Sequence, residues 1–169
     1  MSRLDSFIRR ISSQRDCLNH VFQVIGGIPG PVLELGLGNG RTYHHLLENC
    51  PNRDVYVFEW KVTAHPDCTP DRAHLFEGDI YDTLLQAPTR IAAPAVLAHM
   101  DLVSGDDKRD REIAGFLSNI LPPLMGEQAV ILSDQPLDLP GWQAWDLPDG
   151  VPWERYFYYA RGFSNDRDD

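Results

Sequence analysis

The amino-acid sequence predicts an α/β domain with a mostly parallel sheet, helices on both faces and an antiparallel pair of strands near the C-terminus. Five short apolar segments alternate with segments of helical or loop-like pattern, which is typical of a parallel sheet. Near the C-terminus, two extended segments flank Pro148-Asp149-Gly150, and this turn signal indicates a hairpin. We therefore expect a three-layer sandwich around a seven-stranded sheet, in a single domain over residues 1–169.

The N-terminal segment, residues 1–27, is expected to be helical from about residue 3 to 25. Its apolar residues recur at helical spacing: Leu4, Phe7, Ile8, Ile11, Leu18, Val21, Phe22 and Ile25. Polar residues interrupt this stripe at Gln14 and Arg15, so we expect a break near Ser12-Ser13. The alternative is that these polar side chains face a substrate or a partner. Arg9, Arg10 and Arg15 are interpreted as part of an exposed helix face.

Residues 31–169 form the expected α/β core. The parallel strands are predicted at 31–35, 54–59, 73–79, 95–101 and 129–133, from their apolar and β-branched composition. Helical spacing predicts one helix over residues 43–50, a short one over 81–86 and a longer one over 107–121. The hairpin strands are expected at 142–147 and 153–161.

The loop after the first strand carries the strongest functional signal. In Glu34-Leu35-Gly36-Leu37-Gly38-Asn39-Gly40, three glycines fall within five positions. Glycine suits a backbone that takes positive φ or approaches a ligand closely, and the crevice beyond the first strand is the usual ligand site of such sheets. The loop therefore predicts a site for a nucleotide-like cofactor.

The spacing of these glycines helps to choose between cofactors. Dinucleotide-binding loops follow G-x-G-x-x-G, whereas this loop has one residue fewer before Gly40, so the third glycine belongs to the loop rather than to the helix. The carboxylate of Glu34 would repel phosphate and attract an ammonium or sulfonium group. A nicotinamide dinucleotide stays as the alternative.

With these motifs the sequence resembles the class I S-adenosylmethionine-dependent methyltransferases, which have a Rossmann-like fold. The acid and glycines of Glu34 to Gly40 match the family's first loop, Glu59 matches the acid that takes the ribose hydroxyls, and Gly78-Asp79-Ile80 matches the adenine site. Within that class the chain looks most similar to a small group of bacterial methyltransferase-like proteins of unassigned substrate. The resemblance implies S-adenosylmethionine as cofactor, with these contact residues: Glu34, Gly36, Gly38, Asn39, Gly40, Thr42, Glu59, Trp60, Asp79, Ile80 and Asp101.

The expected activity is methyl transfer to a small acceptor, in which the protein positions the acceptor and removes its proton. Asp101 and Asp134 follow the fourth and fifth strands and are the candidate catalytic residues. Two such carboxylates could also hold Mg²⁺, as in catechol-type O-methyltransferases. Those carry a further acid–amide pair, whereas Asp134 is followed by Gln135 and Pro136, so no metal is expected. A protein that binds S-adenosylmethionine without turnover stays as the alternative function.

Charge and composition limit the partners. The net charge of −10 argues against a nucleic-acid backbone as the main partner. No signal peptide or membrane helix is indicated, and the three cysteines lack paired spacing, so a reducing cytoplasm is the expected location. Something must cover the methyl-donor crevice, and the N-terminal helix of the same or a partner chain is the candidate. We therefore expect a homo-oligomer.

Overall fold

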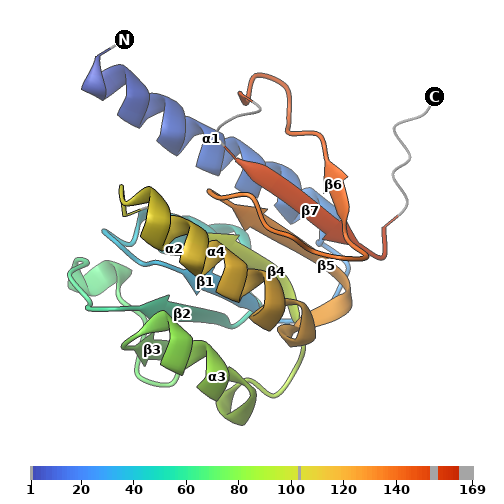
Figure 1. The fold of residues 1–169 in the computed structure, drawn as a ribbon. Helices are drawn as coiled ribbons and strands as arrows, with labels where there is room; N and C mark the ends of the chain where they lie inside the picture. Colours follow the sequence, from blue (N-terminus) through green and yellow to red (C-terminus); the bar gives the residue numbers. More distant parts are fainter. Residues whose placement is uncertain (1, 103, 153–155, 164–169) are drawn as a thin grey trace.

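A computed structural model describes residues 2–102, 104–152 and 156–163 and confirms the predicted α/β sandwich (Figure 1). Its sheet has the order β3-β2-β1-β4-β5-β7-β6, in which the first five strands are parallel and β7 runs antiparallel to both of its neighbours. The strands are β1 (Val32–Leu35), β2 (Val55–Glu59), β3 (Leu75–Glu77), β4 (Ala95–Met100), β5 (Met125–Ser133), β6 (Gln143–Trp145) and β7 (Phe157–Arg161).

The predicted hairpin is confirmed as the antiparallel pair β6 and β7. Its second strand begins at Phe157, and residues 153–155 lie outside the described part of the chain. The strand that returns, β7, inserts between β5 and β6, so β6 forms the sheet edge.

Two helices cover each face of the sheet. On one face α1 (Arg3–Val24) and α2 (Arg41–Asn49) bury Leu18 and Leu46 against the side chains of Val32 and Val57. On the other face α3 (Ile80–Arg90) and α4 (Asp107–Ile120) pack onto the alternate residues of the same strands. Short 3₁₀ turns lie at η1 (Pro66–Cys68) and η2 (Pro122–Leu124).

Helix α1 is continuous, so the expected break near Ser12-Ser13 is wrong. Ser13 keeps its hydroxyl inside the helix by donating to the carbonyl of Arg9 (2.9 Å), and both Ser13 and Gln14 are buried on the inner face. The apolar contacts of Cys17 and Leu18 continue that face, so packing holds the helix through its polar stretch. In Figure 1 the N-terminal end of α1 extends beyond the sheet.

Helix α3 runs from Ile80 to Arg90 and is longer than the short piece expected over 81–86. Pro88 lies inside it without ending it. Arg90, the last residue of the helix, donates to the carbonyls of Arg72 and Ala73, and these bonds hold the last turn of α3 against the segment before β3.

The parallel register brings the carboxyl ends of β1, β2 and β4 to one edge. Leu35 pairs with Phe58 on one side and with Met100 on the other. Gly36, Glu59 and Asp101 therefore leave the sheet side by side, and this edge holds the residues from which a site can be built.

Candidate functional site

The glycine loop combines positive φ angles with close approaches. Gly36, Gly38 and Gly40 have φ of 93°, 51° and 75°. A Cβ at Gly36 would collide with the backbone carbonyl of Asp101, and one at Gly40 would collide with Cys68. A Cβ at Gly38 would meet nothing within 4 Å, so Gly38 faces open space. The loop is thus pressed against the protein at both ends and open in the middle.

A cavity of about 360 Å³ lies at this edge, a size that suits a small ligand. It brings together many of the residues that the sequence singled out: Gly36, Gly38, Glu59, Trp60, Asp79, Ile80 and Asp101. Glu34, Asn39, Gly40, Thr42 and Asp134 do not line it. A larger hollow of about 630 Å³ lies at the opposite edge, around Gly26–Pro31 and Asn49–Asp54, and none of the predicted site residues borders it.

Glu59 ties the second strand to the glycine loop. Its Oε2 accepts hydrogen bonds from the backbone N–H groups of Leu37 (2.7 Å) and Gly38 (3.1 Å), and its Oε1 accepts from Lys61 (3.2 Å). The sequence indicated an acid at the end of this strand but gave no sign of its bonds to the loop. Glu59 therefore holds the loop in place as well as bordering the cavity.

Asp79 begins helix α3 on the far side of the cavity. Its Oδ1 accepts from the N–H of Tyr81 (2.9 Å), which is the hydrogen bond of a helix N-cap. Ile80 and the exposed Trp60 lie at the same cavity and offer apolar surface for a planar ring. This side of the site can therefore present a carboxylate and apolar walls to one ligand.

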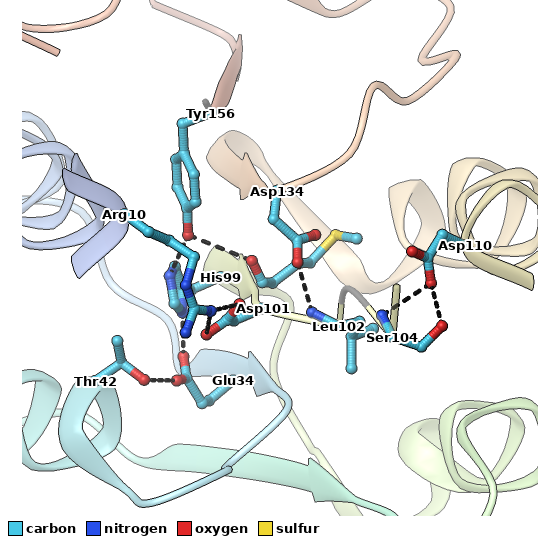
Figure 2. Close-up of polar contacts among 11 residues, drawn as sticks. Arg10, Glu34, Thr42, His99, Asp101, Leu102, Ser104, Asp110, Asp134 and Tyr156 are labelled. Carbon is cyan, nitrogen blue, oxygen red and sulfur yellow. Dashed lines mark hydrogen bonds and ion pairs between the residues drawn. The ribbon is translucent and has the colours of Figure 1, made fainter. Parts of the chain in front are cut away.

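Behind the glycine loop lies a buried hydrogen-bonded chain (Figure 2). Glu34 accepts from the Thr42 hydroxyl and contacts Nδ1 of His99 at 2.6 Å, while Tyr156 contacts Nε2 of His99. The side chains of Glu34 and His99 are both 0% exposed. Glu34 therefore lies beneath the site and not on its wall.

The electrostatics of this chain favour a protonated His99. Burial lowers the pKa of His99, but the carboxylate and hydrogen bond of Glu34 outweigh it and raise that pKa above 6.5. A protonated ring donates from both nitrogens, to Glu34 and to Tyr156, and the hydroxyl of Tyr156 can then donate to the carbonyl of Met100 (3.3 Å). Burial also raises the pKa of Tyr156 well above 10, so its hydroxyl stays protonated.

Asp101 and Asp134, the two predicted catalytic residues, have different surroundings (Figure 2). Both oxygens of Asp101 accept from Nη1 of Arg10, at 2.8 and 3.0 Å. Asp134 accepts from the N–H of Leu102 (2.7 Å) and so fixes the chain just after β4. Within residues 2–102, 104–152 and 156–163, no three His, Cys, Asp or Glu residues are grouped in a way that could hold a metal ion.

The loop after β4 is held by a further acid. Asp110 accepts from both the N–H (3.0 Å) and the hydroxyl (2.7 Å) of Ser104, which borders the cavity. Burial raises the pKa of Asp110, but the Ser104 bonds outweigh it and hold that pKa below 3.8. Asp110 therefore stays ionised and keeps Ser104 at the cavity.

Three site residues were missed from the sequence. Arg10 is exposed, as expected, but its contact with Asp101 at the carboxyl edge was not predicted. His99 carries a weak signal, a single histidine in an otherwise apolar strand. Tyr156 gives no local signal at all, because its partner His99 lies 57 residues away.

Comparison with known proteins shows the family to which the chain belongs. Residues 1–161 match the model of a family described as S-adenosyl-L-methionine methyltransferase. The chain is similar to the crystal structure of an S-adenosyl-L-methionine methyl transferase from Silicibacter pomeroyi, with 42% identity and a TM-score of 0.89 over 96% of this chain and 99% of that one. No functionally curated protein matches the chain.

More distant structures share the fold. A Staphylococcus aureus protein assigned as a caffeoyl-CoA O-methyltransferase has 13% identity and a TM-score of 0.58, over 86% of this chain and 82% of that one. The plantazolicin methyltransferase BpumL, solved with S-adenosylhomocysteine (SAH), has 17% identity and a TM-score of 0.50, over 75% and 46% of the two chains.

Proposed function

Because the chain belongs to the S-adenosyl-L-methionine methyltransferase family, it is a methyltransferase whose cofactor is S-adenosylmethionine, and we propose that the cavity at the carboxyl edge binds this cofactor. One observation carries the proposal. The glycine loop, Glu59, Asp79 with Ile80, and Asp101 come from four different strand ends and border one cavity. The open space at Gly38 also suits a ligand that lies against the loop.

Each wall residue has a chemical role in this proposal. Glu59 accepts a hydrogen bond from the ribose through Oε1, which accepts only from the N–H of Lys61 among the described residues and keeps a free lone pair, whereas Oε2 already accepts two bonds from the glycine loop. Asp79 accepts from the adenine amino group, and Ile80 and Trp60 pack on the ring. Glu34, Thr42 and Gly40 act from behind the loop, Glu34 by its bond to Thr42 and Gly40 by its close approach to Cys68, while the exposed Asn39 does not border the cavity.

Asp101 and Asp134 have different roles in the proposed methyl transfer. Asp101 borders the cavity where the methyl group would lie, and we expect it to contact the cofactor or the acceptor's proton. Asp134 positions the same segment through the N–H of Leu102. The charge of Arg10 beside Asp101 takes the place that a cation would fill, so the proposed reaction is independent of metal. Turnover that persists in EDTA supports this, and turnover lost in EDTA and restored by Mg²⁺ contradicts it.

A test of the cofactor site compares Glu59→Ala with Glu112→Ala, an exposed acid of α4 that does not line the cavity. Calorimetry should show S-adenosylmethionine binding at least tenfold weaker in Glu59→Ala, because charge-assisted bonds to the ribose are lost. Glu112→Ala should bind like the unchanged protein. Equal affinity in both variants would refute the assignment of Glu59.

The acceptor and the assembly are proposed from surface features. The net charge of −10 favours a small molecule over nucleic acid as acceptor, and the expected location is the cytoplasm. In the described part of the chain, no helix is both long enough and apolar enough to cross a bilayer. Release of SAH in the presence of an acceptor library would separate this enzyme from a protein that only binds the cofactor.

We propose that residues 1–169 act as one domain that associates through the end of α1. Leu4, Phe7 and Ile8 are large apolar side chains that are 65%, 41% and 53% exposed, and they lie along one stripe of that helix. Light scattering should give at least twice the 19.2 kDa mass of one chain, and Ile8→Glu should reduce the measured mass. Particles of a single chain at all concentrations would contradict this arrangement.

A further inference from the structure

The buried chain behind the glycine loop joins the two ends of that loop. Glu34 precedes the first glycine and Thr42 follows the last, and the Thr42 hydroxyl donates to Oε1 of Glu34. The other carboxylate oxygen of Glu34 lies 2.6 Å from Nδ1 of His99 on β4. None of these three side chains borders the cavity. They can therefore act on a bound cofactor through the backbone that they hold.

The other end of the chain holds the backbone that leads into Asp101. Tyr156 contacts Nε2 of His99, and its hydroxyl lies 3.3 Å from the carbonyl of Met100, the residue before Asp101. Tyr156 does not border the cavity, whereas Asp101 does. One buried chain thus connects the two ends of the glycine loop with the segment on the other side of the cavity (Figure 2).

The protonation state of His99 determines the direction of these hydrogen bonds. The protonated ring donates from both nitrogens, so the Tyr156 hydroxyl accepts from it and donates to the Met100 carbonyl. A neutral ring that keeps its proton on Nδ1, beside Glu34, has a bare Nε2, which accepts from Tyr156. The hydroxyl has one proton, so the Met100 carbonyl then loses its donor. Loss of one buried proton therefore releases the backbone next to Asp101.

The groups around this chain favour the protonated state of His99. Three carboxylates act on it, one on β1 and the others after β4 and β5: Glu34, Asp101 and Asp134. Burial lowers the pKa of His99, but these charges outweigh it and raise that pKa above 6.5. From α1, Arg10 pairs with Asp101, and Cys17 faces Tyr156 as a neutral thiol, because burial raises its pKa to about 12.

We propose that His99 and Tyr156 are positioning residues of the cofactor cavity and that their buried proton couples cofactor affinity to pH. With the proton present, both the glycine loop and the backbone before Asp101 are held in the geometry that binds the cofactor. Without it, the Asp101 side is released and the cofactor binds more weakly. Binding and protonation are reciprocal, so a bound cofactor must in turn raise the pKa of His99. This inference rests on the proposed function.

The first test measures this linkage with 5′-methylthioadenosine, which is the cofactor without its amino acid end. The probe has no amino acid group, so its own charge does not change over the titration. Calorimetry should show its affinity falling about 3- to 10-fold as the pH rises from 6.5 through the folded pKa of His99. An NMR titration of the ring nitrogens of His99 locates that pKa, which should be about 0.5 to 1 higher with the probe bound. Equal pKa values with and without the probe would overturn the proposal.

Tyr156→Phe separates positioning from a purely structural role. Without the hydroxyl, nothing links the His99 ring to the Met100 carbonyl, so the probe should bind about 3- to 10-fold more weakly than to the unchanged protein at pH 6.5. Its affinity should then no longer fall as the pH rises. The matched control is Tyr159→Phe, which removes a hydroxyl that bonds to the N–H of Leu137 and should keep the pH dependence.

The remaining variants test the titrating group itself. His99→Gln should give the flat profile of Tyr156→Phe, whereas His74→Gln, at a histidine that does not line the cavity, should give the profile of the unchanged protein. If His99→Gln does not fold, the NMR titration and Tyr156→Phe still decide. An equal pH dependence in Tyr156→Phe and its control would overturn the proposal. No binding of SAH or methylthioadenosine by the unchanged protein at any pH would instead refute the proposed function.

Discussion

Two glutamates in neighbouring parallel strands, Glu34 and Glu59, have opposite surroundings. Glu34 pairs in register with Val57 and lies inside the sheet layer, where it is 0% exposed. Glu59 lies two residues further along the register, at the strand end, and borders the cavity. An offset of two residues thus separates a carboxylate that stabilises the fold from one that can meet a ligand.

The largest expected effect is on the buried side of this comparison. Glu34→Ala removes one partner of a buried ion pair and leaves His99 without its carboxylate, which should lower the free energy of unfolding by about 3–5 kcal/mol. Urea unfolding measures the change. The same experiment on Glu59→Ala should show a much smaller loss of unfolding free energy. Glu59 borders the cavity, so water can take over the hydrogen bonds that its carboxylate makes. Comparable losses in the two variants would erase the distinction.

Tyr156→Phe probes the far end of the buried chain. It removes a hydroxyl from a fully buried position, so the donor on His99 loses its acceptor and the protein should lose about 1–3 kcal/mol of stability. The matched control is Tyr159→Phe, whose hydroxyl bonds to the N–H of Leu137 at a half-buried position. A smaller loss in Tyr156→Phe than in the control would show that the chain contributes little.

Asp79→Ala probes the exposed side. Loss of the N-cap of α3 should destabilise the protein by about 1 kcal/mol. If Asp79 also meets adenine, binding of 5′-methylthioadenosine should weaken as well, and Asp79→Asn, a good cap without the charge, should restore stability. Affinity for methylthioadenosine that is unchanged in Asp79→Ala would leave Asp79 with a structural role alone.

The mildest test changes only the pH. The pKa of His99 in the folded protein lies above its ordinary value of 6.5, so its stabilising charge is fully present below pH 6.5 and is lost as the pH rises through the folded value. Chemical unfolding measured as the pH rises above 6.5 should show stability falling, and His99→Gln should flatten that slope. Stability that rises over this range would contradict a protonated His99.

Much of the fold follows from local patterns. The five parallel strands, the hairpin and the glycine loop were all predicted, because apolar alternation, glycine spacing and the turn at 148–150 act over a few residues. The continuity of α1 could not be predicted in the same way. There the buried packing of Ser13 and Gln14 overrides a polar interruption that locally indicates a break.

The parts of the site that sequence reasoning missed depend on distant pairs. Arg10 meets Asp101 across 91 residues, and Glu34 meets His99 across 65. No local spacing encodes such contacts, since they arise only when the sheet order brings β1, β4 and α1 together. Glycine spacing and strand-end acids therefore indicated the position of the cavity, but they did not reveal the buried hydrogen-bonded residues behind the glycine loop.

The position of β7 between β5 and β6 has a consequence for synthesis on the ribosome. Although β6 is made first, its neighbour in the sheet is β7, so it has no place to pair until β7 has left the exit tunnel. Tyr156, which precedes β7, reaches His99 at the same late stage. Until β7 is available, the edge of β5 is unpaired and the buried hydrogen-bonded chain behind the glycine loop lacks Tyr156. The arrival of β7 completes both.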